Sequence, residues 1–563
     1  MTLLSESNSL QWVLQQTIIG CMSSLRQIKL SATIAKISRL LTLQGRHGYI
    51  VGGFIRDLLL ARKTNDIDIA VSGPAITIAR EVAREIGGKF VPLDEVNGIA
   101  RVVVIEDAQQ KQEFQEAEWH FDFSSFPGDI EADLARRDFT INAMAIELSQ
   151  FVAAGKANKG SQKLATFWAE KQSQLKLVDP FYGEEDLRNK IVRGVSEQIF
   201  EDDAARLLRA VRLAAELDFT IEPETESLIR HYSQDITEVS GERIREELLH
   251  LLTLPQAAYH LRYLDKLGLL LALIPELAES KGVEQPTVHF WDVFDHSLQT
   301  VATIEFLMRE GDWEYGNEGM LTTAPWSDMI DRHLSQEISS GSNRKVLLKL
   351  AGLFHDIAKP MTKSIDDTGR ARFLGHTKQG AAMTANILER LRFSNREIRL
   401  VESLVYHHLR PAQMANEELP SQRAIYRYFR DTDDAGIDIL LLALADYLAS
   451  RGPLASMEEW KRHCQVINHI LAEHDKQQTK ILPVKLIDGH DLMDIFGLTP
   501  GPLVGELLAT VNESHASGEL STREEALALV RRELSATSKQ QTGVLQNSQN
   551  SRVKRNLSNG KVD

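Results

Sequence analysis

The chain has 563 residues, of which 43% are apolar and 25% are charged. This length exceeds what one hydrophobic core supports, so the sequence predicts several domains. The net charge of −15 disfavours a general nucleic-acid coat protein, which would usually be basic, but it is compatible with an enzyme that binds RNA through a local basic surface.

Cysteine usage and hydropathy indicate the cellular context. The two cysteines, Cys21 and Cys464, lie far apart in the sequence, which argues against a disulfide scaffold and fits a reducing compartment. No apolar run approaches the roughly 20 residues that a membrane span requires, and the start "MTLLSESNSL" lacks the basic residues of a secretory signal. We therefore expect a cytoplasmic protein with no membrane association and no obligate protein partner.

The first part of the chain predicts a small mixed α/β domain over residues 26–150. The stretch "GYIVGGFIRDLLL" is typical of a strand, a glycine turn and the start of an amphipathic helix. "NDIDIAVSG" alternates as a strand does, and "PAITIAREVAREIGG" predicts a helix that stops at Gly87-Gly88. "ARVVVIED" and "EWHFDFSSF" predict two more strands.

The remainder of the chain is predicted to be almost wholly helical, which makes the fold class α+β. Two segments interrupt the helical pattern: residues 151–176, an insertion to which the sequence gives no role, and the polar residues 311–345, expected as a loop. We expect a helical neck and body over 177–284, a further helical domain over 285–455, a C-terminal helical region over 456–535 and a disordered tail over 536–563.

Two acids in the first domain predict a metal site. Because residues i and i+2 of a strand point to the same face, Asp66 and Asp68 present two carboxylates side by side. Like charges so placed repel unless a cation lies between them. Oxygen ligands of this kind suit Mg²⁺, which commonly also binds substrate phosphates.

The residues just before these acids suit a phosphate. Gly52-Gly53 lets the backbone approach a phosphate closely, and Arg56, at the start of the next helix, can pair with a phosphate oxygen. Either a lone pair of glycines or a lone Asp-x-Asp is a weak signal, since the latter is usually a solvated strand end. Their combination at this spacing predicts a metal-dependent nucleotide site.

"GGFIRD" with "DIDIAVSG" resembles the signature of the class II tRNA nucleotidyltransferases, the CCA-adding enzymes, and of the related bacterial poly(A) polymerases. Further segments resemble family motifs in the same order. They are "RRDFTINAMA", "DPFYGEEDLRNKIVRGV", "DDAARLLRAVRLAAELDF" and "ERIREEL", which closes the neck, followed much later by "LIDGHDLMDIFGLTPGPLVGELL". The resemblance implies an α/β catalytic head followed by a helical neck.

The resemblance also implies roles for the head residues. Asp66 and Asp68 would hold Mg²⁺ for transfer of a nucleotide to an RNA 3′-hydroxyl, and Asp122 in "HFDFSS" could add a third carboxylate. The remaining implied nucleotide-binding residues contact the triphosphate or the ribose. Gly52, Gly53, Arg56 and Arg137 would bind phosphate, and Asp138 and Asn142 would hydrogen-bond the ribose hydroxyls.

In the neck, the resemblance makes Asp203 and Arg206 an amino-acid template that pairs with C and A. A spacing of three places two side chains on one helical face, where an acceptor and a guanidinium fork can match a base edge. The alternative is an (i, i+3) surface ion pair. One departure from the family is visible: Asp202 stands where a glutamate is usual, which keeps the charge but shortens the reach.

A second set of motifs resembles the HD phosphohydrolase superfamily. The segments are "VHFWDVFDHSLQTV", "LLKLAGLFHDIAKP", "FLGHTKQG", "VYHHLRP" and "LLLALADYLAS". The implied metal ligands are His296, His355, Asp356 and Asp446, and His376 with His408 could complete a second metal position, with His407 as the rival of His408. Imidazoles and carboxylates suit a transition metal such as Mn²⁺, Fe²⁺ or Ni²⁺. Single buried histidines are more often structural, and a degenerate HD fold is the alternative.

The resemblance implies an enzyme that adds C and/or A residues from CTP and ATP to the 3′ end of tRNA, with CCA, CC-only or A-only addition left open. A poly(A) polymerase is the first alternative, although only "SRVKRNLSNGK" in the tail is basic. A second alternative makes HD-type hydrolysis the main activity. A third, a non-catalytic RNA-binding protein, is disfavoured because Asp66 and Asp68 are both present.

Overall fold

The structure is a computed structural model, and it describes residues 24–106, 117–126, 128–150, 176–286, 288–414, 419–479, 486–516 and 518–535. The expectations for the tail over 536–563 and for the insertion, apart from Lys176, lie outside these residues. The chain divides into two compact units, residues 1–254 with 263–273 and residues 255–262 with 274–563. Among the described helices, none has the length and apolar content needed to cross a membrane.

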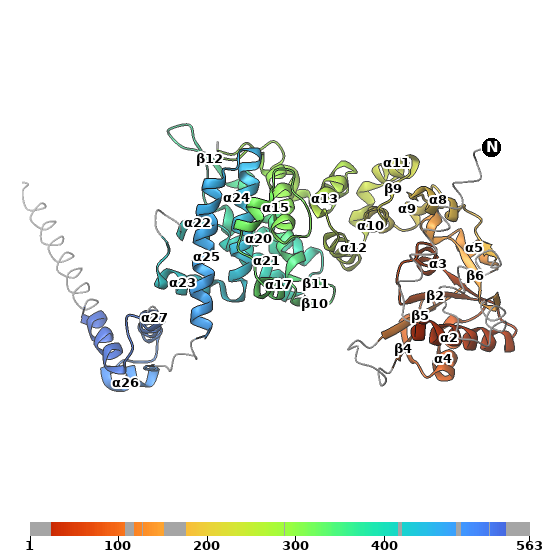
Figure 1. The fold of residues 1–563 in the computed structure, drawn as a ribbon, viewed down its shortest axis with the longest axis horizontal. Helices are drawn as coiled ribbons and strands as arrows, with labels where there is room; N and C mark the ends of the chain where they lie inside the picture. Colours follow the sequence, from red (N-terminus) through yellow and green to blue (C-terminus); the bar gives the residue numbers. More distant parts are fainter. Residues whose placement is uncertain are drawn as a thin grey trace, which may run out of the picture. The chain divides into compact units, whose positions relative to one another are not determined.

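The first unit contains a seven-stranded sheet in the order β3-β4-β5-β2-β1-β6-β7 (Figure 1). Its strands are β1 (Gly48–Val51), β2 (Asp66–Val71), β3 (Lys89–Asp94), β4 (Ile99–Glu106), β5 (Ala117–Ser125), β6 (Ala145–Glu147) and β7 (Leu177–Val178). Among the described strands of this sheet, the β2–β5 pair is parallel and the other pairs are antiparallel. Its register sets Asp66 opposite His120 and Asp68 opposite Asp122, so the acids of β2 and β5 lie at one end of the central strands.

Two helices of the head have the boundary that the sequence predicts, the start of α3 and the end of α4. Gly52 has a φ of 72°, which glycine adopts at little cost, and it ends β1 so that α3 (Gly53–Leu59) can begin. Helix α4 (Ala75–Ile86) buries the apolar face containing Ile78 and Val82 and ends at Gly87 in the left-handed conformation. The other head helices are α2 (Ser24–Leu43), α5 (Ile130–Leu134) and the 3-10 turn η1 (Thr140–Asn142).

The neck is helical apart from one short parallel strand pair. Its elements are α8 (Gly183–Asn189), β8 (Ile191–Val192), α9 (Ile199–Asp202), α10 (Arg206–Leu217), β9 (Thr220–Ile221), α11 (Pro223–His231), η2 (Ser233–Glu238), α12 (Gly241–Thr253), α13 (Ala257–Lys266) and α14 (Leu269–Leu273). Helices α10 and α12 pack against each other, with Leu208 and Val211 among the buried residues of the first and Leu248 and Leu252 among those of the second.

The second unit is built on α15 (Val293–Leu307), α18 (Arg344–Phe354), α21 (Asn395–His407) and α24 (Gly436–Arg451), which pack on one another. Around them lie η3 (Pro275–Ser280), α19 (Lys359–Thr362), the hairpin β12 (Lys363–Ile365) and β13 (Ala371–Phe373), α20 (His376–Arg390), α22 (Arg410–Met414) and α23 (Gln422–Thr432). α25 (Met457–Thr479) runs beside α24 (Figure 1). The predicted α+β fold class, a mixed head followed by helices, is confirmed.

The prediction of a loop over residues 311–345 is wrong in part. This segment contains α16 (Glu318–Thr323), α17 (Asp328–Leu334) and the paired strands β10 (Glu337–Ser339) and β11 (Ser342–Asn343). The polar residues that suggested a loop include helix caps, because the side chain of Asn317 accepts from the Met320 N–H and that of Ser327 from the Ile330 N–H. Tertiary packing also stabilises this segment, since Trp313 and Met320 are buried.

The C-terminal helical region has its own small core. Helices α26 (Gly489–Phe496) and α27 (Pro502–Ala516) and a helix over 523–535 enclose Leu492, Val511 and Val530.

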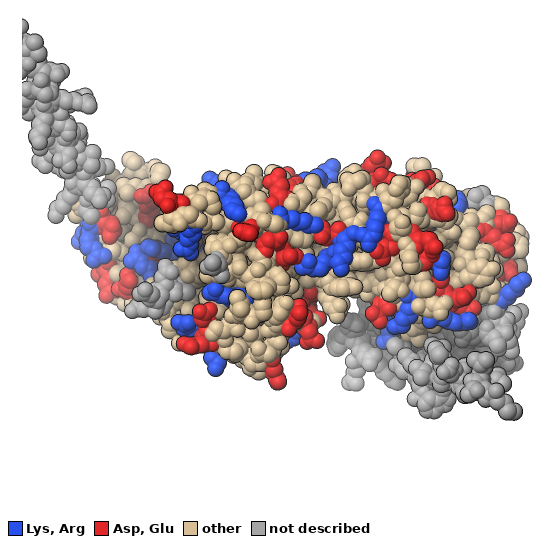
Figure 2. Space-filling view, turned by 90° about the horizontal axis from the view of Figure 1, so that it is seen from above, with Lys and Arg blue, Asp and Glu red and all other residues tan. Residues whose placement is uncertain are grey.

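On the face drawn in Figure 2, basic and acidic side chains are interspersed rather than separated by sign. This face therefore offers a polyanion local groups rather than a broad positive field.

Candidate active sites in the head and in the HD domain

A cavity of about 540 Å³ lies between the sheet of the head and the helices of the neck. Its walls carry backbone glycines, acids and arginines from several motifs. The lining residues are Gly52, Gly53, Asp68, Ile99, Arg136, Arg137, Asp138, Asn142, Asp203, Ala205, Arg206, Arg209, Arg243, Glu246 and Glu247. The structure thus brings most of the predicted nucleotide-binding residues to one cavity, together with Arg209 and Arg243, which the sequence did not single out.

The two predicted metal-binding acids differ in environment. Burial raises the pKa of Asp68, and the neighbouring carboxylates of Asp122 and Asp66 add to the rise against the opposing effect of Arg137. The Asp66 side chain is 63% exposed, and its Oδ1 lies 2.8 Å from Nδ1 of His120. A divalent cation between Asp66 and Asp68 would relieve the repulsion, so the donor set fits Mg²⁺.

Asp122 occupies the expected position beside Asp68 but is already paired. Its two oxygens accept hydrogen bonds from Nε and Nη2 of Arg101, at 2.7 and 2.8 Å. Arg101 thereby occupies one acceptor position on each oxygen and orients the carboxylate. The structure brings Asp122 into register with the other two acids, and its role as a third metal ligand stays a prediction.

Gly52 lets two functional side chains approach the backbone. A Cβ added at Gly52 would lie 2.8 Å from Nη1 of Arg137 and 3.0 Å from Oδ2 of Asp68. Arg136 and Arg137 both pair with one acid, Asp133. Both also line the cavity, where a guanidinium can bind the oxygens of a triphosphate.

The sequence predicted that Arg56 would bind phosphate, but its side chain does not line the cavity. It is buried, its Nε and Nη2 donate to Asp57, and its Nη1 donates to Oδ1 of Asn142 at 2.9 Å. The amide of Asn142 in turn donates to Asp138 at 3.1 Å. Because Asp57 directly follows Arg56 and captures its guanidinium, Arg56 orients Asn142 here rather than pointing at a phosphate.

Asp138 is the end point of this chain of hydrogen bonds. Its Oδ1 accepts from the Phe139 N–H at 2.8 Å and from Asn142, and its Oδ2 lies 2.9 Å from Nε of Arg209. Burial opposes ionisation, but Arg209 and these hydrogen bonds hold the pKa of Asp138 below its ordinary value. Asp138 is therefore an oriented, ionised acceptor at the cavity wall.

The expectation that Asp203 and Arg206 share one helical face is wrong. Asp203 has extended backbone angles (φ −158°, ψ 101°) and separates α9 from α10, because its carboxylate caps the following turn by accepting from the Ala205 N–H. Nε of Arg206 lies 4.0 Å from Asp203, while its two terminal nitrogens donate to the carbonyls of Ile199 and Arg136. Both side chains still line the cavity.

The second unit brings all six predicted HD residues together from the ends and faces of five helices. His296 lies on α15, His355 and Asp356 follow α18, His376 opens α20, His408 follows α21 and Asp446 lies on α24. Two groups of potential metal ligands result among the described residues: His296, His355 and Asp446, and Asp356, His376 and His408. His407, the rival of His408, belongs to neither group.

Asp356 lies between the two groups and turns one oxygen to each. Its Oδ2 is 3.4 Å from Nε2 of His296 and 3.2 Å from Nε2 of His355. Its Oδ1 is 3.4 Å from Nε2 of His376 and 3.8 Å from Nε2 of His408. A carboxylate in this position can bridge two cations.

Three of the four histidines are held in the tautomer that binds metal through Nε2. Nδ1 of His355, His376 and His408 each faces a backbone carbonyl, at 2.9, 2.7 and 2.8 Å, so Nδ1 carries the proton and donates. Nε2 of His376 and of His408 and Oδ1 of Asp356 are buried without a hydrogen-bond partner. Buried polar atoms are rarely left unpaired, so these three atoms fit a transition metal such as Mn²⁺, Fe²⁺ or Ni²⁺.

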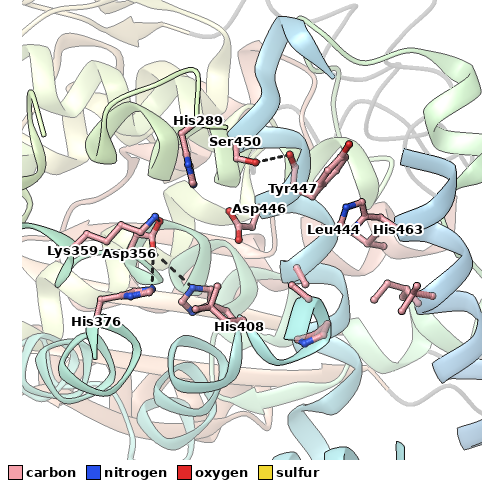
Figure 3. A pocket seen from close by; sticks show the side chains of 16 residues that line it. His289, Asp356, Lys359, His376, His408, Leu444, Asp446, Tyr447, Ser450 and His463 are labelled. Atoms are coloured by element: carbon pink, nitrogen blue, oxygen red, sulfur yellow. Dashed lines mark hydrogen bonds and ion pairs between the residues drawn. The ribbon is translucent and has the colours of Figure 1, made fainter. Parts of the chain in front are cut away.

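Four of the six residues, Asp356, His376, His408 and Asp446, line a cavity (Figure 3). Lys359 also lines it, with Nζ 2.6 Å from Oδ2 of Asp356. Burial lowers the pKa of His408 to about 4, so it is neutral and able to ligate at physiological pH. The far wall is mainly apolar, and Tyr447 and His463 lie against each other there with ring centroids 3.9 Å apart.

Three family models match successive parts of the chain. The Poly A polymerase head domain matches residues 48–193, the "probable RNA and SrmB-binding site of polymerase A" matches residues 218–281, and the HD domain matches residues 293–451.

Curated relatives match most of the chain. An A-adding tRNA nucleotidyltransferase of Deinococcus radiodurans is 33% identical over 489 residues, which cover 86% of this chain and 94% of the relative. A CC-adding tRNA nucleotidyltransferase of Thermus thermophilus is also 33% identical, over 493 residues, with coverage of 86% and 93%.

Solved structures share the fold at low identity. The Thermotoga maritima CCA-adding enzyme in complex with tRNA has a TM-score of 0.54 at 21% identity and covers 92% of this chain and 98% of its own. A complex of a CCA-adding enzyme with CTP has a TM-score of 0.56 at 20% identity, with coverage of 92% and 98%.

Proposed function

Because the chain belongs to the tRNA nucleotidyltransferase family, we propose that it adds C and/or A residues from CTP and ATP to the 3′ end of tRNA at the head cavity. The observation that carries this proposal is the meeting of Asp68 with the arginines of head and neck at one cavity. An acidic metal position beside several guanidinium groups matches a nucleoside triphosphate with its cation. A cytoplasmic location stays a prediction.

The proposed roles follow the geometry. Asp66 and Asp68 would hold Mg²⁺, which stabilises charge on the transferring phosphoryl group. Gly52, Gly53 and Arg137 would bind the triphosphate, and Asp138 with Asn142 would bind the ribose hydroxyls. Arg56 supports the ribose contact through Asn142, and Asp122 would act on the electrostatics of Asp68.

Asp203 and Arg206 offer a base one acceptor and one donor. C presents an amino donor next to a ring-nitrogen acceptor, and A does the same, which matches an acid followed by a guanidinium. U and G present a carbonyl acceptor next to a ring N–H, which is the reverse order. The pair would therefore favour CTP and ATP over UTP and GTP without a nucleic-acid template.

Replacing either member of this pair is expected to relax base choice. Asp203→Ala or Arg206→Ala removes a hydrogen bond to a charged group, which is worth roughly 1.5–3 kcal/mol, or about ten- to a hundred-fold in discrimination. The measurement is kcat/KM for each of the four nucleotides on a tRNA transcript. Unchanged ratios in both variants would contradict the template role, and the exposed neck residue Glu224 provides a control as Glu224→Ala.

The test of the function itself uses tRNA transcripts that end at the discriminator base, at C or at CC. Each is incubated with CTP, ATP or both, and the product lengths are measured. Extension by two C residues, by one A or by CCA identifies the subtype, which matters because the A-adding and CC-adding relatives are equally identical to this chain. A long A tail would support a poly(A) polymerase, and no extension in any tube would refute the proposal.

A second candidate function rests on the HD cluster. We propose that it binds a pair of divalent transition-metal ions and hydrolyses phosphoester bonds. The split of the Asp356 oxygens between two histidine groups favours this function over an inactive HD fold. Bound metal would activate water for attack on phosphorus. The proposed substrates are 2′,3′-cyclic phosphates or phosphomonoesters at RNA ends, because such ends block nucleotide addition.

A further inference from the structure

Helix α12 carries Arg243, a residue of the "ERIREEL" segment, into the wall of the head cavity. We propose that Arg243 is a positioning residue for nucleotide selection: it fixes the carboxylate of Asp203 so that one oxygen accepts from the amino group of C or A. This inference rests on the proposed function and adds a residue to it. It assigns Arg243 no contact with the nucleotide.

The contact is a two-point clamp. Nη1 of Arg243 donates to Oδ1 of Asp203 at 2.9 Å, and Nη2 donates to Oδ2 at 2.7 Å. Two parallel hydrogen bonds fix the plane of the carboxylate as well as its distance, which a single point charge does not. Arg206 is not close enough to do this, since its Nε lies 4.0 Å away.

Asp203 needs such a clamp because its own backbone does not hold it. It lies between two helices in an extended conformation, and one hydrogen bond, from the Ala205 N–H at 3.1 Å, reaches its Oδ1 from the following turn. The terminal torsion of an aspartate side chain is broad, so one bond to one oxygen leaves the carboxylate plane poorly defined. Arg243 supplies the missing constraint.

The clamp also determines how many acceptor positions remain. Each carboxylate oxygen offers about two lone pairs. At Oδ1 both are used, by Ala205 and Arg243, whereas at Oδ2 one is used, by Arg243. One acceptor position is left, in a fixed direction, and a single amino group of C or A is what it can accept.

Stability alone does not account for Arg243. Helix α12 is anchored one turn further on by Glu247, which pairs with Arg212 of α10, and by buried Ile244 and Leu248. The Arg243 side chain is 53% exposed, and such ion pairs contribute little to folding. Losing it should therefore change base choice more than the fold.

The test compares Arg243→Ala, Arg243→Lys and the control Arg230→Ala in kcat/KM for the four nucleotides on one tRNA transcript. Arg230 lies on α11 of the same neck, pairs with Glu226 and does not line the cavity. We expect Arg243→Ala to lower discrimination against UTP and GTP about tenfold, the effect of one misplaced hydrogen bond, while CTP or ATP is still added. Lysine, which keeps the charge but not the fork, should restore discrimination only in part.

Unchanged discrimination in Arg243→Ala would overturn the proposal, and so would full restoration by lysine, since charge alone would then suffice. If Arg243→Ala does not fold, the lysine variant decides: wild-type discrimination in it overturns the clamp. If the wild type adds no nucleotide, the function proposed above has failed instead. Binding of CTP, ATP, UTP and GTP without RNA then tests the clamp separately, and identical preferences in wild type and Arg243→Lys would refute it.

Discussion

Asp68→Ala and Asp66→Ala are each expected to abolish nucleotide addition. Each removes one of the two carboxylates that would hold Mg²⁺ at the head cavity, and charge stabilisation by a metal is worth several kcal/mol in the transition state. This corresponds to a rate loss on the order of a thousand-fold. The measurement is single-turnover addition of CTP or ATP to a tRNA transcript at saturating Mg²⁺.

The same substitution at Asp68 should not destabilise the metal-free protein. Its pKa is raised in the folded state, so the folded protein binds the proton more tightly than the unfolded chain does. Stability from this group therefore falls as pH rises above the ordinary carboxyl pKa, and at neutral pH the ionised group is a cost that alanine removes. In EDTA at pH 7, the Tm of Asp68→Ala should equal or exceed that of wild type.

Glu85→Ala is the matched control, because Glu85 is an exposed carboxylate on α4 of the same head. It should leave both the rate and the Tm unchanged. Wild-type rates in folded Asp66→Ala or Asp68→Ala protein would show that these acids are not the catalytic pair. A large fall in Tm would show instead that Asp68 is structural.

The parts of the head that could be predicted from sequence are those decided by neighbours along the chain. The glycine turn at Gly52, the alternation that places Asp66 and Asp68 on one face and the stop of α4 at Gly87 each depend on a few adjacent residues. The resemblance to a family predicted that Asp138 and Asn142 belong to the same nucleotide site. The sheet order was not needed for that prediction, and both residues line the cavity.

What could not be predicted depends on which partner a side chain finds across the fold. Arg56 was expected at a phosphate, but each of its three nitrogens donates to the adjacent Asp57 or the distant Asn142. Asp122 was predicted as a metal ligand, which stays a prediction, and its partner Arg101 lies directly opposite it only through the pairing of β4 with β5. Arg243 meets Asp203 across 40 residues, and no local pattern contains that pair.

The HD ligands show the same division. Their residue types and order along the chain identified the cluster, yet the choice between His407 and His408 required the end of α21. His408 is the residue that follows the helix and faces Asp356, while His407 occupies its last turn. The sharing of Asp356 between two groups is likewise a property of the packed helices.

The two candidate sites should be chemically separable because each is assembled from its own residues. The head cavity uses residues between Gly52 and Glu247, and the HD cluster uses residues between His296 and Asp446, which fall in different compact units. The head cavity and the HD cluster share no residue. A variant that empties the HD cluster should therefore leave the Mg²⁺ position of the head intact.

His355→Ala with Asp356→Ala is accordingly expected to remove metal and phosphoester hydrolysis while nucleotide addition continues. The double substitution removes His355 from the first group of ligands and Asp356, whose two oxygens face both groups. Even the loss of an outer partner of a metal ligand costs roughly 10- to 100-fold in affinity, so this loss should exceed about 100-fold. Metal content after loading with Mn²⁺, Fe²⁺ or Ni²⁺ and hydrolysis of a 2′,3′-cyclic nucleotide and a phosphomonoester are the measurements. A metal-dependent rise in Tm, seen in wild type only, gives a readout independent of activity.

Single substitutions at the adjacent histidines sharpen this test. His408→Ala removes a ligand of the second group and should lower metal content, whereas His407→Ala changes a half-buried neighbour outside both groups and should not. Equal metal content in these two variants would contradict the assignment of the second position.

If wild-type protein loaded with each of the three metals hydrolyses neither substrate, or if the double variant keeps the full hydrolytic rate, the HD cluster is not a phosphohydrolase centre. Because buried Asp356 also pairs with Lys359, Asp356→Asn serves as the variant that preserves packing if the double variant does not fold.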